Sequence, residues 1–338
     1  MDASSSFNHG VVSRAPPYLA LKQVEGSDQP IFYSVYTKKA SGVEGLGSLT
    51  NTNCWATPQG WVLVRDAPSQ TTYLADPHNP TDTDTGRIPL PHLPDENLPT
   101  QCTCLLSDYP SADAAAAGQT RSSCVVLLVE THAAVIWYCR IGGEAWVRHE
   151  YDIGTLDLGY GQSEKLIICP IAACRGKFYF NGGCGFKEVG VLEFSSPAAA
   201  ATPVFSTIVI RRNPIAGPKV FRKVFMVESE QELFMVSLMS GLDLDVVFGL
   251  TVHKMDFVRD EWIQVDDIGG RAFLLSYWHF GASRSADECG LERNCLYVPY
   301  TWKKRVMIFN VRDRTAKVQD LRGAPASNQV LWMLPTHP

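Results

Sequence analysis

Ten cysteines give this chain its largest capacity for chemistry, because a thiolate can bind zinc or act as a nucleophile. Cys102 and Cys104 are separated by one residue, and the alternation of side chains along a strand places both on one face. Cys124 is expected on the neighbouring strand, but no fourth ligand follows at a zinc-finger spacing. We therefore interpret these thiols as small buried residues and predict no metal site. The same interpretation applies to Cys169, Cys174, Cys184, Cys289 and Cys295.

The eight histidines form no catalytic motif. They stand at positions 9, 78, 92, 132, 149, 253, 279 and 337, and neither HExxH nor GxSxG occurs. A Ser-His-Asp set assembled from separate strands stays open, because a triad is defined by its geometry rather than by sequence order. We predict no catalytic residue and no cofactor.

Several polar segments have compositions suited to ions. Residues 181–185 (NGGCG) are rich in glycine, but a strand rather than a helix is expected after them, which indicates a hairpin turn rather than a phosphate loop. Residues 81–85 (TDTDT) carry carboxylates that suit calcium, but they lack the closing Glu of an EF-hand loop, and we interpret them as a solvated loop. The pair Arg211-Arg212 and residues 303–305 (KKR) are interpreted as exposed charge, with phosphate binding or nuclear import as alternatives.

Residues 278–293 (WHFGASRSADECGLER) are the best candidate for recognition of a partner. Aromatic and arginine side chains are the usual hot-spot residues of protein interfaces. We predict that a protein partner docks here on Trp278, His279, Arg284 and Arg293. The alternative is that Trp278 packs beneath a long loop that contains one helical turn at Ala286–Leu291.

The elements that must position these residues read as β-strands. No stretch of about 12 residues keeps the apolar spacing of an amphipathic helix. Apolar runs are short, rich in β-branched and aromatic residues, and bounded by turn residues that include many of the 26 Gly and 21 Pro. This pattern indicates an all-β sandwich, barrel or propeller.

The strands group in fours, which favours the propeller. The first strands of five sets begin near residues 51, 101, 166, 220 and 272, a spacing of about 50 to 65 residues that suits one blade. The fifth set comprises Ala272–Tyr277, Asn294–Tyr300, Arg305–Val311 and Ala316–Leu321. The segment 278–293 therefore becomes a loop, on the same face as three other long loops, His78–Gly86, Asp108–Ser123 and Ser195–Phe205.

The remaining strands lie at the two ends of the chain. Gln329–Pro335 has no partner in the fifth set, and Tyr18–Val24 and Ile31–Thr37 precede the first set. We predict that they share a sixth blade, because pairing of the two ends closes the ring without a free edge. The prediction is one propeller of six four-stranded antiparallel blades over residues 18–338, after a flexible tail at 1–17, with seven blades as the alternative.

The motifs of this propeller resemble a known plant family. The matching residues are GWVLV at 60–64, LADP at 74–77 with RIPLP at 87–91, and a run from WIQV at 262–265 through AFLL at 272–275, GAS at 281–283 and NCLY at 294–297 to VMIFNV at 306–311. They resemble the Domain of Unknown Function 295 family, the KIB-type β-propeller of plant F-box-related proteins. The resemblance implies a propeller that recognises other proteins, and members with an F-box resemble substrate receptors of SCF ubiquitin ligases. Only 17 residues precede the first predicted strand, too few for an F-box, so none is expected here.

Composition restricts the partners. The net charge of −5 argues against nucleic acid and anionic membranes, and no apolar run approaches the roughly 20 residues of a membrane helix. Without a secretory signal the thiols are expected to be reduced, in the cytoplasm or nucleus, with an organellar transit peptide as the alternative. We predict a monomeric, non-catalytic protein–protein interaction module, with an SCF receptor whose F-box is supplied by a partner as the second hypothesis. The alternative is a propeller enzyme or small-ligand binder with a site at the central channel.

Overall fold

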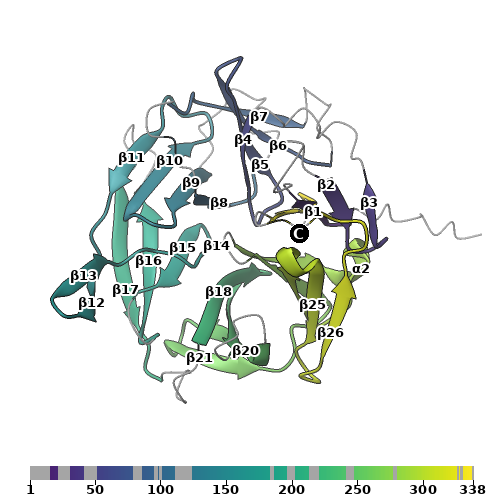
Figure 1. Cartoon of the computed structure of the whole chain (residues 1–338). Helices are drawn as coiled ribbons and strands as arrows, with labels where there is room; N and C mark the ends of the chain where they lie inside the picture. Colours follow the sequence, from purple (N-terminus) through teal and green to yellow (C-terminus); the bar gives the residue numbers. More distant parts are fainter. Residues whose placement is uncertain are drawn as a thin grey trace, which may run out of the picture.

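The computed structural model describes residues 16–21, 31–41, 52–78, 86–94, 98, 101–110, 124–182, 186–195, 202–212, 221–240, 247–276, 280–325, 327 and 330–336. Six sheets stand around a central axis in a closed ring (Figure 1). The predicted six-bladed propeller is therefore confirmed. No helix in the described ranges is long and apolar enough to cross a membrane.

Four blades are regular four-stranded antiparallel sheets in chain order. Blade 1 holds β4 (Thr52–Ala56), β5 (Val62–Asp66), β6 (Thr71–Ala75) and β7 (Arg87–Leu90). Blade 2 holds β8 (Cys102–Leu106), β9 (Val125–Glu130), β10 (Val135–Arg140) and β11 (Val147–Glu150). Blade 3 holds β14 (Ile171–Cys174), β15 (Lys177–Asn181), β16 (Glu188–Phe194) and β17 (Pro203–Val209). Blade 4 holds β18 (Phe221–Ser229), β19 (Glu232–Ser240), β20 (Val247–Asp256) and β21 (Glu261–Val265).

The stacking of the blades explains why their strands are apolar on both faces. In β9, Val126 and Leu128 pack with Leu63 of blade 1, on one face of the sheet. Val125 and Leu127 belong to the next core, which blade 2 shares with blade 3. Successive residues of a strand point to opposite faces, so one continuous apolar run supplies two interblade cores.

The fifth blade departs from the prediction. It contains five strands, β22 (Arg271–Leu275), β23 (Gly281–Ser285), β24 (Cys295–Tyr300), β25 (Arg305–Asn310) and β26 (Ala316–Asp320). The innermost strand, β23, runs antiparallel to β22, whereas β24 runs parallel to β22. The segment expected to be a loop thus returns through the blade as β23 and then forms the short helix α2 (Ala286–Cys289), where a helical turn was expected.

The two ends of the chain share the sixth blade, as predicted. Its strands are β27 (Val330–Met333), β1 (Tyr18–Leu21), β2 (Ile31–Ser34) and β3 (Lys39–Ser41), in that order. Trp332 of β27 is 0% exposed, and its indole Nε1 donates to the Leu275 carbonyl of blade 5 at 3.1 Å. The C-terminal strand therefore joins its own sheet to the blade that precedes it.

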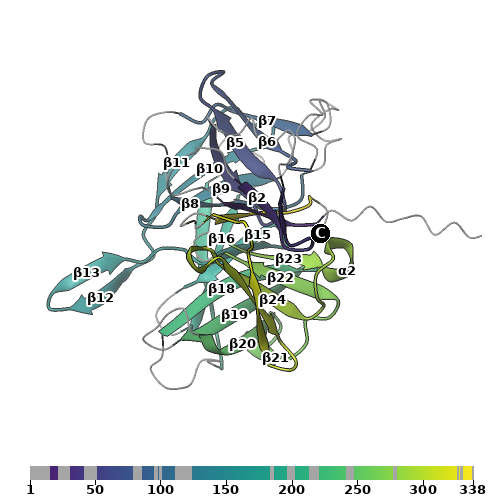
Figure 2. The same cartoon turned by 45° about the vertical axis from the view of Figure 1, so that its right-hand side comes forward.

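One element stands outside the ring. The strands β12 (Thr155–Gly159) and β13 (Gln162–Lys165) form a two-stranded hairpin between blades 2 and 3. The hairpin projects away from the body of the propeller (Figure 2). The sequence predicts no strand within residues 153–165, so the hairpin is a further correction.

Candidate functional site

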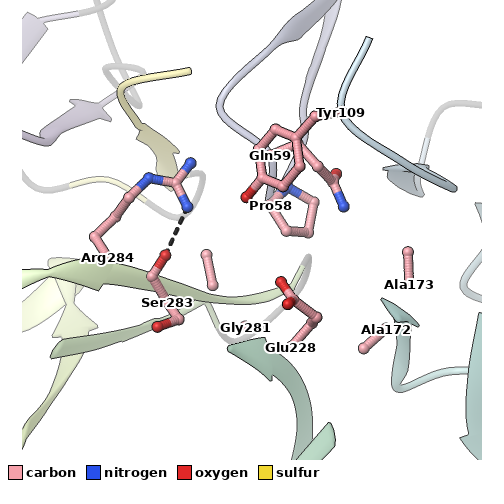
Figure 3. A pocket seen from close by; sticks show the side chains of 10 residues that line it. Pro58, Gln59, Tyr109, Ala172, Ala173, Glu228, Gly281, Ser283 and Arg284 are labelled. Atoms are coloured by element: carbon pink, nitrogen blue, oxygen red, sulfur yellow. Dashed lines mark hydrogen bonds between the residues drawn. The ribbon is translucent and has the colours of Figure 1, made fainter. Parts of the chain in front are cut away.

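A small cavity lies at the centre of the ring, where the innermost parts of several blades meet (Figure 3). Its polar lining includes Gln59 from the β4–β5 turn, Tyr109 after β8, Glu228 near the end of β18, and Ser283 and Arg284 on β23. The cavity volume is about 10 Å³, which has room for about one water molecule.

Arg284 lies in the interior of the propeller rather than in the surface loop predicted for it. Its side chain is 1% exposed, and its Nε and Nη2 atoms donate to the Pro335 carbonyl at 3.1 and 2.8 Å. A third bond runs from Nη1 to the Ser283 carbonyl at 2.7 Å (Figure 3). Burial lowers the pKa of Arg284 from its ordinary value. The expectation of an exposed Arg284 is wrong, because the guanidinium points inward and holds the C-terminal segment.

The C-terminal segment also contacts blade 1. Gly60 has a φ of +95°, and a Cβ at this position would lie 2.3 Å from the Pro335 carbonyl oxygen. The hydroxyl of Thr336 lies 3.2 Å from the Asp76 Oδ2 atom. The glycine of the GW motif is thus required by the close passage of the chain end, which the sequence pattern alone did not reveal.

Glu228 is the ionisable group of the cavity with the most unusual environment. Its Oε1 atom accepts a 2.7 Å hydrogen bond from the Gln231 amide. Burial raises the pKa of this carboxyl, while the nearby Arg271 and Arg284 oppose the shift. Ser283 lies in the same network, since its hydroxyl accepts from Arg271 Nε at 3.0 Å. A partly buried acid of this kind could accept or release a proton, but the cavity leaves little room for a substrate beside it.

Arg284 and Arg293, the two predicted partner-binding residues that the structure describes, do not share a surface, because Arg284 is buried and Arg293 is exposed. Trp278 and His279 lie outside the described residues. Arg293 is exposed and forms a bidentate ion pair with Asp287, with 2.8 Å between Arg293 Nε and Asp287 Oδ1. Arg293 precedes β24, and Cys295, the first residue of β24, pairs with Ala272 of β22.

The surroundings of Arg293 also differ from those of Arg284. Arg293 instead lines a surface groove of about 400 Å³ together with Asp267, Asn294 and Arg312. Arg312 is itself paired with Asp267. The groove therefore carries mixed charges that already pair with one another.

The tip of the β12–β13 hairpin is an exposed element that the sequence analysis did not predict. Gly159 pairs with Gln162 in the register of the two strands, which leaves Tyr160 and Gly161 as a two-residue loop. Both loop residues have positive φ angles, +55° and +75°, as a type I′ turn requires. Tyr160 is fully exposed, and Leu158 is 47% exposed. The signal in the sequence is GYG at 159–161, a glycine-flanked aromatic residue at a turn.

Comparison with known proteins now identifies the family. The KIB1-4 beta-propeller family matches residues 32–318. The chain belongs to this family. Two solved structures are similar to this KIB1-4 propeller. They are the periplasmic gluconolactonase PpgL of Pseudomonas aeruginosa (11% identity, TM-score 0.35, 95% of this chain and 100% of that chain) and apo AztD from Citrobacter koseri (8% identity, TM-score 0.32, 94% and 97%). These similarities carry no argument about function, and no curated protein matches the sequence.

The thiols of the KIB1-4 propeller have the environments of core residues. Burial raises the pKa of Cys124 to about 11 and that of Cys169 to about 12, and it raises the pKa of Cys104 still further. No three His, Cys, Asp or Glu side chains converge in a metal-binding arrangement within the described ranges. Cys184 and the TDTDT stretch at 81–85 lie outside those ranges, whereas Arg211 and Arg212 are exposed.

Proposed function

We propose that this KIB1-4 propeller is a non-catalytic protein-binding module and that the β12–β13 hairpin is its main recognition element. The resemblance of its motifs to plant F-box-related propellers supports a role in substrate recognition, in the cytoplasm or nucleus. The observation that carries the proposal is the position of the hairpin, which projects from a ring that does not need it (Figures 1 and 2).

The hairpin contributes little to the stability of the ring. Within the described residues, β12 and β13 form a two-stranded sheet of their own, and every residue of β13 is exposed. A lone two-stranded hairpin is marginally stable in water, because it buries almost no apolar surface. The fold alone therefore gives no reason for this element, and segments of this kind usually serve binding.

Tyr160 has the properties of an interface anchor. A type I′ turn favours Asn, Asp or Gly at this position, and a bulky residue with a positive φ angle is strained by about 1–3 kcal/mol. The fully exposed ring recovers none of this energy through packing in the described structure. A tyrosine that is strained and unburied in the free protein is well suited to burial in a pocket of a partner.

The substitution Tyr160→Asn tests the proposal, because it removes the ring and keeps a residue that the turn prefers. Val258→Ala is the matched control, since Val258 is an apolar side chain that is 90% exposed on a turn of blade 4. Quantitative affinity capture from plant extract, followed by titration of the purified partner, should show binding at least tenfold weaker for Tyr160→Asn and unchanged for Val258→Ala. Equal binding by Tyr160→Asn and the wild type would contradict the proposal.

The competing function is a small-ligand or catalytic site at the channel, which the partly buried Glu228 near Arg284 favours. The cavity volume of about 10 Å³ opposes it, because drug-sized ligands occupy pockets of roughly 300 Å³ or more. An enzymatic activity or a ligand affinity that Glu228→Gln abolishes and Tyr160→Asn retains would favour a site at the channel instead.

A further inference from the structure

An exposed tryptophan stands beside a run of cations at the outer side of blade 5. The 3-10 helix η2 (Thr301–Lys303) follows β24, and Trp302 within it is 60% exposed. Lys303, Lys304 and Arg305 come directly after it and are exposed as well. We call these residues, together with Arg322, the 302–305 patch.

The backbone holds this patch in one conformation. The Thr301 hydroxyl donates to the Ser327 carbonyl at 2.6 Å and is buried. Lys304 adopts a left-handed conformation with a φ of +51°, and its amide donates to the Thr301 carbonyl at 3.0 Å. The Leu321 amide in turn donates to the Lys304 carbonyl at 2.7 Å. Trp302 is therefore presented to solvent by a hydrogen-bonded turn rather than by a loose loop.

The charge of the patch is opposite to that of the whole chain. Asp320, the last residue of β26, pairs with Arg305 at 3.3 Å. Among the described residues, Lys304 and Arg322 add two further positive charges beside this pair, on a protein whose net charge is −5. An indole flanked by cations complements a peptide that carries acidic residues around an apolar one, because both the apolar area and the charge are matched.

We propose that the 302–305 patch is a second interaction surface of this propeller, which binds an acidic peptide segment of a partner protein with an apolar residue seated on Trp302. This inference rests on the proposed function in taking the partner to be a protein. A protein segment is favoured over nucleic acid because one small patch on an acidic chain provides few phosphate contacts.

The test measures fluorescence anisotropy of a short labelled peptide in which Glu and Asp surround one Phe and one Leu, with a Gln and Asn version as the peptide control. The charge reversal Lys304→Glu/Arg322→Glu and the truncation Trp302→Ala should each weaken binding about tenfold or more, and added salt should weaken it in the wild type. Arg211→Glu/Arg212→Glu is the matched control, because it changes the net charge equally at an exposed pair elsewhere and should bind as the wild type does. The milder Trp302→Phe keeps an aromatic ring and should retain most of the affinity.

Other outcomes would overturn the inference. Absence of peptide binding to the folded wild type, an equal loss in the Arg211/Arg212 control, or tighter binding of a duplex oligonucleotide through the same residues would each do so. Tyr160→Asn should leave peptide binding unchanged, which separates this surface from the hairpin. If Tyr160→Asn loses partner capture and the wild type binds no peptide, the patch is refuted and the hairpin is not. If the wild type binds the peptide and Tyr160→Asn captures the partner as well as the wild type does, the hairpin is refuted and the patch is not.

Discussion

The closure of the ring makes Gly60→Ala an informative substitution. The Cβ of alanine would lie 2.3 Å from the Pro335 carbonyl oxygen and 2.7 Å from its carbonyl carbon. Contacts this short do not occur, so the chain end must move away from blade 1. Because the same carbonyl accepts two hydrogen bonds from the buried Arg284, that movement also disturbs the centre of the ring.

The expected cost has two parts. The φ of +95° at Gly60 strains any L-residue by about 1–3 kcal/mol. Weakened bonds from a buried guanidinium add about 1.5–3 kcal/mol, since hydrogen bonds to charged groups are the stronger ones. Gly142→Ala isolates the first part, because Gly142 has a φ of +74° and nothing lies within 4 Å of its added Cβ. Gly60→Ala should therefore destabilise the protein by about 2 kcal/mol more than Gly142→Ala.

Urea unfolding followed by circular dichroism measures this difference. For a chain of about 340 residues, an excess of about 2 kcal/mol corresponds to a Tm lower by about 3 °C. Removal of residues 335–338 supplies a second control, since without the Pro335 carbonyl the Gly60→Ala change should cost only the strain. Equal losses for Gly60→Ala and Gly142→Ala in the full chain would refute the contact between the chain end and blade 1.

Two further predictions concern the core. Trp332→Ala should cost about 3–5 kcal/mol in urea unfolding, because it empties a buried site, whereas Trp302→Ala at an exposed site should change stability by no more than about 0.5 kcal/mol. Similar effects of the two substitutions would show that β27 does not seal the ring. Burial raises the pKa of Glu228, so the stability that protonation provides is present at low pH and lost as the pH rises through the raised pKa. Glu228→Gln should thus stabilise the protein at about pH 7 and converge with the wild type near about pH 4, and a difference that grows toward low pH would contradict this.

The sequence was informative wherever one strand serves two cores. The run VVLLV at 125–129 is fully buried, and its alternate residues divide between two interblade cores. Such runs, bounded by turn residues, predicted the strands and their grouping. The unpaired Gln329–Pro335 segment likewise predicted the closure, because an apolar strand at a chain end needs a neighbour.

The innermost strand of blade 5 was not predicted, for a physical reason. β23 reads GASRS, without the β-branched and aromatic residues that mark a strand. Small residues are required here because the blades converge at the axis, where a Cβ on Gly281 would lie 2.6 Å from the Val227 side chain. Packing near the axis thus overrides strand propensity, and Arg284 was assigned to a surface loop as a consequence.

The hairpin was missed for the opposite reason, since almost nothing packs against it. Its strands carry few apolar residues, and without a buried face the alternation that reveals a strand is absent. The same holds for the exposed Trp302, whose type suggests a core residue. Whether such a side chain is exposed depends on the packing of the whole fold, which the local sequence does not specify.

The two proposed surfaces stand on different parts of the ring, which makes a further prediction possible. The hairpin emerges between blades 2 and 3, whereas Trp302 belongs to blade 5 (Figure 1). A partner that touches both must extend across the propeller, and its two contacts then reinforce each other through a high effective concentration. In that case Tyr160→Asn and Trp302→Ala should each weaken capture of the same protein, and the double variant should lose it. Two separate partners would instead be lost one at a time, each with its own substitution, and that result would rule out a single bridging partner.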